Sequence, residues 1–270
     1  MESDLNIPVV MTFAGNDPTG GAGLQADIET LASMGCHAAP VVTALTIQDT
    51  QDVKGYATID TALLIQQARA VLEDMPVAMF KLGMLGGVEI IEAIHSILVD
   101  YPDIPVVYDP VISSGAGTSM FDDNMLDAMA NMLFPMTTIL TPNTLEAKRL
   151  APEADTVDAC AQVLQQLGCE FVLVTGTHEG SKDVINHLYG DHRLIESYKW
   201  TRLPHSYHGS GCTLSSAIAG LMAHGLEPYT AIYEAQEYTW EALRSGYRVG
   251  MGQHIPNRLF WAAGMEENDE

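Results

Sequence analysis

Short apolar runs rich in β-branched residues alternate along this chain with longer stretches in which apolar residues recur at helical spacing. Strands separated by helices in this way are typical of a parallel sheet that is covered on both faces. The pattern therefore predicts an α/β fold. The expected strands are 7–15, 38–47, 78–83, 105–111, 138–142 and 171–176, and the expected helices are 22–34, 61–74, 88–100, 123–133, 157–168, 212–224 and 229–248.

The stretch 184–203 has a different pattern, because its apolar and polar residues alternate around the turn signal YGDHR. This pattern predicts a hairpin that extends the sheet. The chain has no internal repeat, no low-complexity linker and no break in composition. We therefore expect a single domain over residues 1–270, with a disordered acidic tail at 265–270.

The charge of the chain argues against several classes of partner. The net charge is −23, with only 12 lysines and arginines, so neither nucleic acid nor an anionic membrane is an expected partner. The apolar run at 7–15 is too short to cross a bilayer and no leader segment precedes it, so we expect a cytoplasmic protein. The four cysteines form no CxxC pair, which argues against a disulfide framework and a zinc site.

Residues suited to chemistry follow almost every predicted strand. In open α/β sheets, ligands bind outside the carboxyl ends of the strands. We therefore predict an active site at this edge of the sheet. The segments at these positions read, in chain order, GNDPTGGAG, QDTQD, KLGM, DPVISSGAG, TPNTLE, TGTHEG and HGSGC.

The segment HGSGCTLSSA, residues 208–217, predicts a tight glycine turn that leads into a helix. Such a turn presents backbone N–H groups at the positive end of the helix dipole, where an anion binds well. It is not a Walker A motif, since the chain contains no Gly-Lys-Ser/Thr. A thiol at a helix start has a lowered pKa, so Cys212 is a candidate proton acceptor. The alternative is a small buried residue at a tight turn.

Two carboxylates follow buried strands, Asp109 in VVYDPV and Glu146 in TPNTLE, and Asn143 lies beside the second. Carboxylate and amide oxygens at one sheet edge suit Mg²⁺. The alternative is helix capping by Asn143 or Thr144, with Glu146 in the first helical turn.

The glycine-rich segment at 15–27, GNDPTGGAGLQAD, opens the first predicted helix. Its glycines allow the backbone to approach a ligand closely, and Asp27 lies one turn inside the helix. A dinucleotide-binding interpretation is disfavoured, because the spacing is not GxGxxG and no acidic residue closes the second strand.

Four further polar residues have both a functional and a structural interpretation. Lys81 lies in an apolar run and predicts a buried ion pair with a carboxylate. Gln48 ends an apolar strand and is either a partner for a heterocycle or a turn residue. Among the histidines, His208 is best placed near a ligand, and both it and His178 are otherwise surface or packing residues.

Taken together, these segments resemble the hydroxymethylpyrimidine/phosphomethylpyrimidine kinases of thiamine biosynthesis, which belong to the ribokinase-like superfamily. The resemblance extends from about residue 8 to about residue 261, where GMGQHIPNRLFW ends it. It implies a three-layer α/β/α sandwich with a mostly parallel sheet, ATP and Mg²⁺ as cofactors, and a homodimer. The segments occur in the family's order: GNDPTGGAGLQAD, VTALTIQDT, KLGML, DPV, TPNTLEA and HGSGCTLSSA.

The resemblance also implies roles for individual residues. The pyrimidine is expected to contact one set of side chains, the transferred phosphoryl group to bind the glycine turn, and Mg²⁺ to lie near the two carboxylates. The nucleotide is expected at the ends of neighbouring strands. These sets are Ala22, Asp27, Gln48, Met84, Val111 and Cys212 for the pyrimidine; Gly209, Ser210, Gly211 and Cys212 for the phosphoryl group; Asp109 and Glu146 for the metal; and Asn143, Thr175, Gly176 and Thr213 for the nucleotide.

A further hypothesis concerns the cysteine, since related sugar kinases carry aspartate at its position. The family phosphorylates first a hydroxymethyl group and then the resulting monophosphate, and a fixed carboxylate would repel that second, anionic acceptor. We therefore hypothesise that Cys212 is a base for the alcohol step and is dispensable for the phosphate step. The chain departs from the family at Thr175 and Gln236, where lysines are expected.

The expected activity is the two-step, ATP-dependent phosphorylation of hydroxymethylpyrimidine to its pyrophosphate. A pyridoxal kinase is the nearest alternative, because both substrates are heterocycles that carry a hydroxymethyl group. A pyrimidine-binding protein without turnover is a third interpretation, suggested by the two missing lysines. The segment 111–119 is expected either to cover the pyrimidine as a flap or to be an ordinary surface loop.

Overall fold

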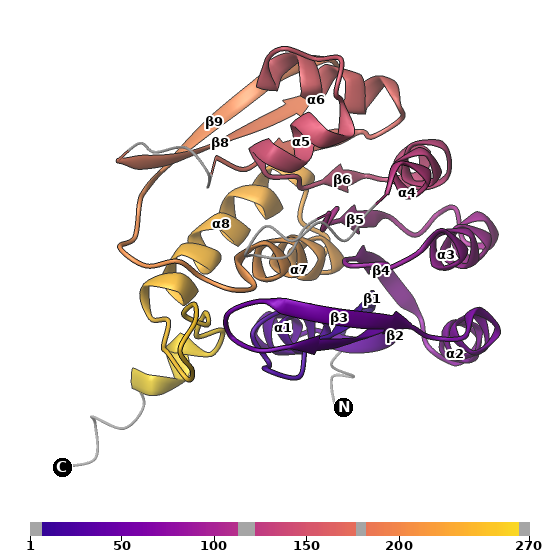
Figure 1. Cartoon of the computed structure of the whole chain (residues 1–270), viewed down its shortest axis with the longest axis horizontal. Coiled ribbons are helices and arrows are strands. Elements are labelled where there is room, and N and C mark those ends of the chain that lie inside the picture. The colour runs from indigo at the N-terminus through magenta and orange to yellow at the C-terminus, as the bar shows by residue number, and fades with distance from the viewer. Residues whose placement is uncertain (1–6, 113–121, 177–181, 265–270) are drawn as a thin grey trace, which may run out of the picture.

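The computed structural model of this chain describes residues 7–112, 122–176 and 182–264. All strands in these residues join one sheet, in the order β3-β2-β1-β4-β5-β6-β7-β8-β9 (Figure 1). The strands from β2 to β7 in this order run parallel, whereas β3, β8 and β9 pair antiparallel to their neighbours. The strands are β1 Val9–Asn16, β2 His37–Gln48, β3 Val53–Thr58, β4 Val77–Leu82, β5 Val106–Tyr108, β6 Ile139–Leu140, β7 Phe171–Val174, β8 Asp183–Gly190 and β9 Arg193–Thr201.

Helices cover both faces of the sheet and make the predicted three layers (Figure 1). Neighbouring strand residues pack into opposite layers: Met79 joins the core beneath α1, α7 and α8, while Phe80 joins the core beneath α2 to α6. This alternation is why the parallel strands read as continuous apolar runs. One face carries α1 Gly23–Ser33, α7 Ser210–Ala223 and α8 Pro228–Arg244; the other carries α2 Thr61–Asp74, α3 Val88–Asp100, α4 Asp123–Ala128, α5 Thr144–Leu150 and α6 Val157–Gln166.

The predicted hairpin at 184–203 is confirmed as β8 and β9. Its two turn residues, Asp191 and His192, both have positive φ angles, of 51° and 56°. This is the backbone of the tight hairpin turn whose twist matches that of the strands.

The sequence pattern missed three short elements and misjudged the length of a helix. It assigned neither β3 nor α5, which are short and lack a strong apolar period, nor the 3-10 turn Phe260–Gly264. The helix predicted at 123–133 continues past α4 as a π-helical turn, Met129–Leu133, and a 3-10 turn, Phe134–Met136. Pro135, which lacks a backbone N–H, lies in that last turn. Among the described residues, no helix is both long enough and apolar enough to span a membrane.

Candidate active site

The polar segments predicted from the sequence meet at the carboxyl ends of the parallel strands. Asp109 follows β5, Asn143 follows β6, and Thr175 follows β7, where it forms a bridge with Asn143. The start of α7 reaches the same edge, because a Cβ atom placed on Gly211 would lie 3.4 Å from Asp109 Oδ2. The predicted edge therefore brings a helix N-terminus and a carboxylate together.

A fully buried ion pair supports this edge from beneath. Lys81 Nζ on β4 lies 2.8 Å from Asp27 Oδ1 on α1, and neither side chain has exposed surface. Ser216 Oγ on α7 donates to the same oxygen at 2.7 Å. Burial alone would lower the pKa of Lys81, but the nearby charge of Asp27 raises it, so the lysine is charged. The predicted ion pair is confirmed, and Asp27 holds Lys81 beneath the surface of the site.

Asp109 is a buried carboxylate with a pKa close to neutrality. Burial raises the pKa of this group to about 6, opposed by the charge of Lys81 and assisted by that of Asp27. The side chains of Cys212 and Ser215 lie close enough to favour the ionised form. The Cys212 thiol therefore lies beside the carboxylate that follows β5.

The prediction of a lowered pKa for Cys212 is wrong. The thiol is buried, and burial raises its pKa to about 12, despite the opposing charge of Lys81. Asp109 and Asp27 raise it further, and only a hydrogen bond from the Gly23 N–H adds to the effect of the lysine. Helix α7 begins at Ser210, so Cys212 is its third residue rather than its first. Desolvation and two carboxylates therefore outweigh the helix dipole.

Glu146 and Asn143 form a reciprocal cap at the start of α5. Asn143 Oδ1 accepts from the N–H groups of Leu145 and Glu146, and the Asn143 N–H donates to Glu146 Oε2 at 2.8 Å. The capping interpretation of these residues is thus confirmed. Burial, together with the charge of Asp109, raises the pKa of Glu146 to about 8. The cap places a second buried carboxylate next to the first.

Gly209 and Gly21 bring two glycine-rich segments into direct contact. Gly209 has a φ of +83°, in the left-handed region that favours glycine. A Cβ atom on Gly209 would lie 1.9 Å from the Gly21 carbonyl oxygen, so no larger residue fits. No side chain of the described residues caps α7 at this end, and the N–H groups of Ser210, Gly211 and Cys212 have no partner within the helix.

Thr213 is fully buried, and its hydroxyl group has partners within the protein. The hydroxyl donates to the Gly209 carbonyl at 2.8 Å and accepts from Arg258 Nε at 3.0 Å. Its single proton is therefore used. The hydroxyl of Thr213 holds the glycine turn, and the predicted contact of this residue with the nucleotide stays a prediction.

His208 links the glycine turn to Asp17, which follows β1, and to Gln48, which ends β2. Its Nε2 atom lies 2.9 Å from Asp17 Oδ2 and 2.9 Å from Gln48 Nε2. Asp17 also accepts from the backbone N–H groups of Thr19 and Ala22, and these bonds shape the loop of residues 17–22. The sequence analysis missed Asp17, although an aspartate before Pro and Gly is a known signal for a side chain that bonds its own turn.

The remaining residues expected around the pyrimidine follow β1, β4 and β5. Ala22 precedes α1, and its N–H is held by Asp17. Met84 follows β4 and approaches Gly15, where an added Cβ atom would lie 3.1 Å from its sulfur. Val111 packs against the same apolar core as Met84. Most of the segment 111–119 lies outside the described residues, as does His178.

The comparisons with known proteins agree with this geometry. The family model of phosphomethylpyrimidine kinase matches residues 17–257. A hydroxymethylpyrimidine/phosphomethylpyrimidine kinase of Mycobacterium tuberculosis is 36% identical over 94% of each chain. The chain belongs to the phosphomethylpyrimidine kinase family. Its activity class is therefore that of a kinase, a phosphotransferase.

Other relatives extend this family assignment. The thiamine biosynthesis bifunctional protein ThiED of Geobacter sulfurreducens is 35% identical over 94% of this chain and 52% of its own length. The crystal structure of phosphomethylpyrimidine kinase from Clostridium difficile matches with a TM-score of 0.74 and 32% identity, covering 87% of this chain and 99% of that one. An ADP complex of Bacillus subtilis pyridoxal kinase matches with a TM-score of 0.86 and 27% identity, covering 95% and 99%.

Thr175 and Gln236 stand where lysines are expected in this family. A chain of hydrogen bonds connects Gly176, the neighbour of Thr175, to Gln236. The Gly176 N–H donates to Asn186 Oδ1 at 3.1 Å, and Asn186 Nδ2 donates to Gln236 Oε1 at 2.8 Å. Gln236 also accepts from Trp200 Nε1 at 3.0 Å. Gln236 is buried, and its side-chain oxygen accepts hydrogen bonds from neutral partners on β8 and β9. It therefore holds this hairpin against α8.

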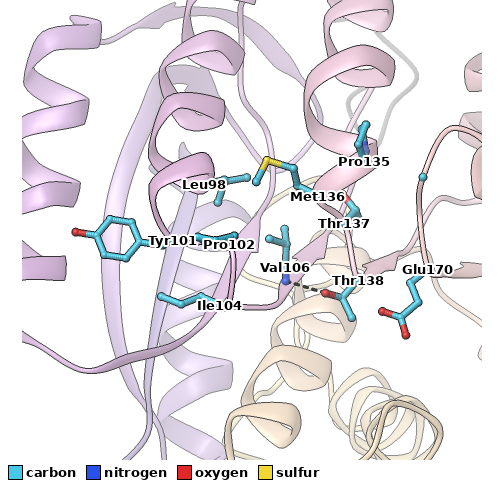
Figure 2. A pocket seen from close by; sticks show the side chains of 11 residues that line it. Leu98, Tyr101, Pro102, Ile104, Val106, Pro135, Met136, Thr137, Thr138 and Glu170 are labelled. Carbon is cyan, nitrogen blue, oxygen red and sulfur yellow. Dashed lines mark hydrogen bonds between the residues drawn. The ribbon is translucent and has the colours of Figure 1, made fainter.

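The cavity in Figure 2 is separate from the candidate site of this kinase. It has a volume of about 290 Å³ and is bordered by Val106, Thr138 and Glu170 at the opposite ends of the central strands. The Thr138 hydroxyl already accepts from the Val106 N–H at 3.1 Å (Figure 2). The cavity includes none of the predicted site residues, so we place the site by its chemistry at the other edge.

Proposed function

We propose that this protein is an ATP-dependent kinase of thiamine biosynthesis. It phosphorylates 4-amino-5-hydroxymethyl-2-methylpyrimidine to the monophosphate and then to the pyrophosphate. The names of the curated relatives supply the substrate class. The main structural support for phosphoryl transfer is the start of α7, where backbone N–H groups without a helical partner lie close to the buried carboxylate of Asp109. The ADP complex of the Bacillus pyridoxal kinase supports a nucleotide cofactor.

Asp109 and Glu146 suit a magnesium ion. Both are buried, both have a raised pKa, and Asp109 contributes to raising that of Glu146, so a divalent cation would relieve an unfavourable pair of charges. Mg²⁺ typically binds through one or two carboxylates together with substrate phosphates. When bound, the ion would supply positive charge to the phosphate oxygens of ATP.

The residues of this chain act mainly by positioning and by electrostatics. The amides of Gly209 to Cys212 would bind the transferred phosphoryl group. Cys212, as a neutral thiol, offers no charge to repel a monophosphate acceptor. A neutral thiol is compatible with the second step, as the cysteine hypothesis requires. For the first step the hypothesis needs a thiolate base, and the raised pKa argues instead for a neutral thiol beside Asp109.

A pyridoxal kinase is the second candidate function. The observation that favours it is the TM-score of 0.86 with the Bacillus pyridoxal kinase, which exceeds the 0.74 with the Clostridium phosphomethylpyrimidine kinase. The sequence identities run the other way, at 27% and 32%. We give more weight to identity, because one fold hosts many substrates.

Three further expectations accompany the proposed function. We propose that the kinase acts as a homodimer, as its family resemblance implies, and sedimentation equilibrium would measure this. We also propose that it acts in the cytoplasm. Its small-molecule partners are then ATP and the pyrimidine, and its net charge of −23 opposes binding to nucleic acid.

The test is to incubate the protein with ATP, Mg²⁺ and hydroxymethylpyrimidine and to follow the products by phosphorus NMR. Monophosphate followed by pyrophosphate is the expected result. A parallel reaction contains pyridoxal, and faster turnover there would assign the second candidate function. The Asp109→Asn variant is the matched control, since it keeps the side-chain volume and removes the charge.

A further inference from the structure

Arg258 is a large, fully buried side chain that the site described above leaves without a function. It is 1% exposed and lies in the segment that follows α8. The match to the kinase family model ends at residue 257, just before it. Because a buried charge is costly unless it is well bonded, its partners indicate what it does.

The guanidinium group of Arg258 bonds three separate parts of the chain. Nη2 donates to the Gly21 carbonyl, and Nη1 lies 3.5 Å from the Gly20 carbonyl. Nη1 also forms an ion pair with Glu29 Oε2 on α1 at 2.9 Å. Nε donates to Thr213 Oγ1 on α7 at 3.0 Å. The planar fork of arginine thus joins the loop of residues 17–22 to the first turn of α7.

The atoms that accept hydrogen bonds from Arg258 also hold the loop of residues 17–22 against the glycine turn at Gly209. The Gly21 carbonyl, which accepts from Arg258, is the same oxygen against which Gly209 packs. The Thr213 hydroxyl, which also accepts from Arg258, donates a hydrogen bond to the Gly209 carbonyl. Arg258 therefore acts on Gly209 from two sides, through Gly21 and through Thr213.

We propose that Arg258 is a positioning residue for phosphoryl transfer. It fixes the acceptor side of the site, formed by residues 17–22, relative to the amides of Gly209 to Cys212. The proposal rests on the proposed kinase function of that site. A misplacement of about 1 Å between reacting groups can cost about a hundredfold in rate, so the expected defect is in kcat.

A purely structural role makes a different prediction. Arg258→Met removes one partner of the ion pair with Glu29, so a purely structural role predicts a lower Tm with kcat of the folded enzyme unchanged. Lysine keeps the charge, but its three donors lie on one nitrogen and cannot reach the separate acceptors that Nε, Nη1 and Nη2 of the planar fork contact. Under our proposal, both Arg258→Met and Arg258→Lys lower kcat by about a hundredfold, with the KM for ATP changed by less than about threefold.

The experiment measures kcat and both KM values for these two variants in the two-step assay. Leu164→Ala in α6 is the control for lost stability, because Leu164 is fully buried and is part of the core on the opposite face of the sheet from Arg258's helix partners. It should lower Tm and retain kcat.

Hydrogen exchange gives a readout that needs no turnover. Segments 17–23 and 209–213 should exchange faster in Arg258→Lys than in the wild type, while the amides of β4 and β5 keep their protection. Wild-type kcat in both Arg258→Met and Arg258→Lys, or unchanged exchange in these two segments, would overturn the proposal. If the wild type itself turns over no substrate, the kinase function has failed, and exchange alone then decides the role of Arg258. If Arg258→Met does not fold, Arg258→Lys decides it.

Discussion

Two buried carboxylates near the same sheet edge, those of Asp27 and Glu146, differ in how the protein compensates their negative charge. Asp27 is balanced from within the chain: Lys81 lies 2.8 Å away, and Ser216 donates to the same oxygen. Glu146 has backbone donors and the side chain of Asn143 nearby, but no ion pair with a cation among the described residues. Its pKa is raised to about 8, by burial and by Asp109.

This difference suggests that Asp27 stabilises the fold, whereas Glu146 is available to bind a cation. A carboxylate whose counter-charge is built into the protein holds the fold, and removing its partner should cost stability. A carboxyl group whose ionised form has no counter-charge in the protein is suited to bind a cation from outside, and replacing it by a neutral amide should cost activity. The predictions below test this contrast.

The largest expected effect is on stability, from Lys81→Met. This change leaves Asp27 buried without its partner, which should lower the free energy of unfolding by about 3–5 kcal/mol. Urea denaturation measures it. Adding Asp27→Asn to the variant should recover part of the loss, because the orphaned charge is then gone. An equal loss in the single and double variants would show that packing, and not charge, is responsible.

Glu146→Gln should have the opposite profile. Glutamine can still complete the cap with Asn143, so the free energy of unfolding should be unchanged or higher. The rate of phosphoryl transfer should fall by about a hundredfold, since the negative charge that would hold Mg²⁺ is lost. Steady-state kinetics and urea denaturation together test this. A variant that is less stable but fully active would contradict the contrast.

The stability of the metal-free protein should depend on pH in a defined direction. The folded-state pKa values of Asp109 and Glu146, about 6 and about 8, lie above their ordinary values. These two groups are protonated in both states at low pH and cost no stability there. The cost begins to grow near pH 4, where they ionise in the unfolded chain, and it levels off above about pH 6 for Asp109 and about pH 8 for Glu146.

Mg²⁺ should reverse that cost most strongly at high pH. We expect Mg²⁺ to raise Tm by about 3 °C more at about pH 9 than at about pH 6. Thermal unfolding with and without Mg²⁺ measures this, and Glu146→Gln should reduce the difference. A Tm increment that is independent of pH in the wild type would argue against the two carboxylates as the metal site.

The smallest expected effects concern Cys212. Because its pKa is about 12, it acts as a neutral group, and Cys212→Ser should change each step by less than about tenfold. Cys212→Asp adds a third carboxylate beside Asp109 and Asp27, and should slow the phosphate step more than the alcohol step. Phosphorus NMR of the two products gives the ratio. A selective loss of the alcohol step in Cys212→Ser would restore the thiolate hypothesis.

Much of the fold was predictable because its signals are local. The strand and helix periods, the hairpin turn at Asp191 and His192, and the capping interpretation of Asn143 each depend on a few neighbouring residues. The position of the site was also predictable, since parallel strands place all their carboxyl ends at one edge. Short elements such as β3 and α5 were missed, because too few residues carry their pattern.

A parallel sheet covered on both faces, and the polar residues that follow its strands, were predictable from periodicity and local motifs, and the motifs together indicated the family by resemblance. The protonation of Cys212 was not predictable from the sequence, since the thiol's pKa depends on burial beside Lys81, Asp27 and Asp109 in the folded chain. The tertiary structure likewise decided the place of Arg258, whose partner Gly21 is 237 residues away in the chain. Desolvation and contacts between distant segments arise only when the chain is folded, so no local pattern encodes them.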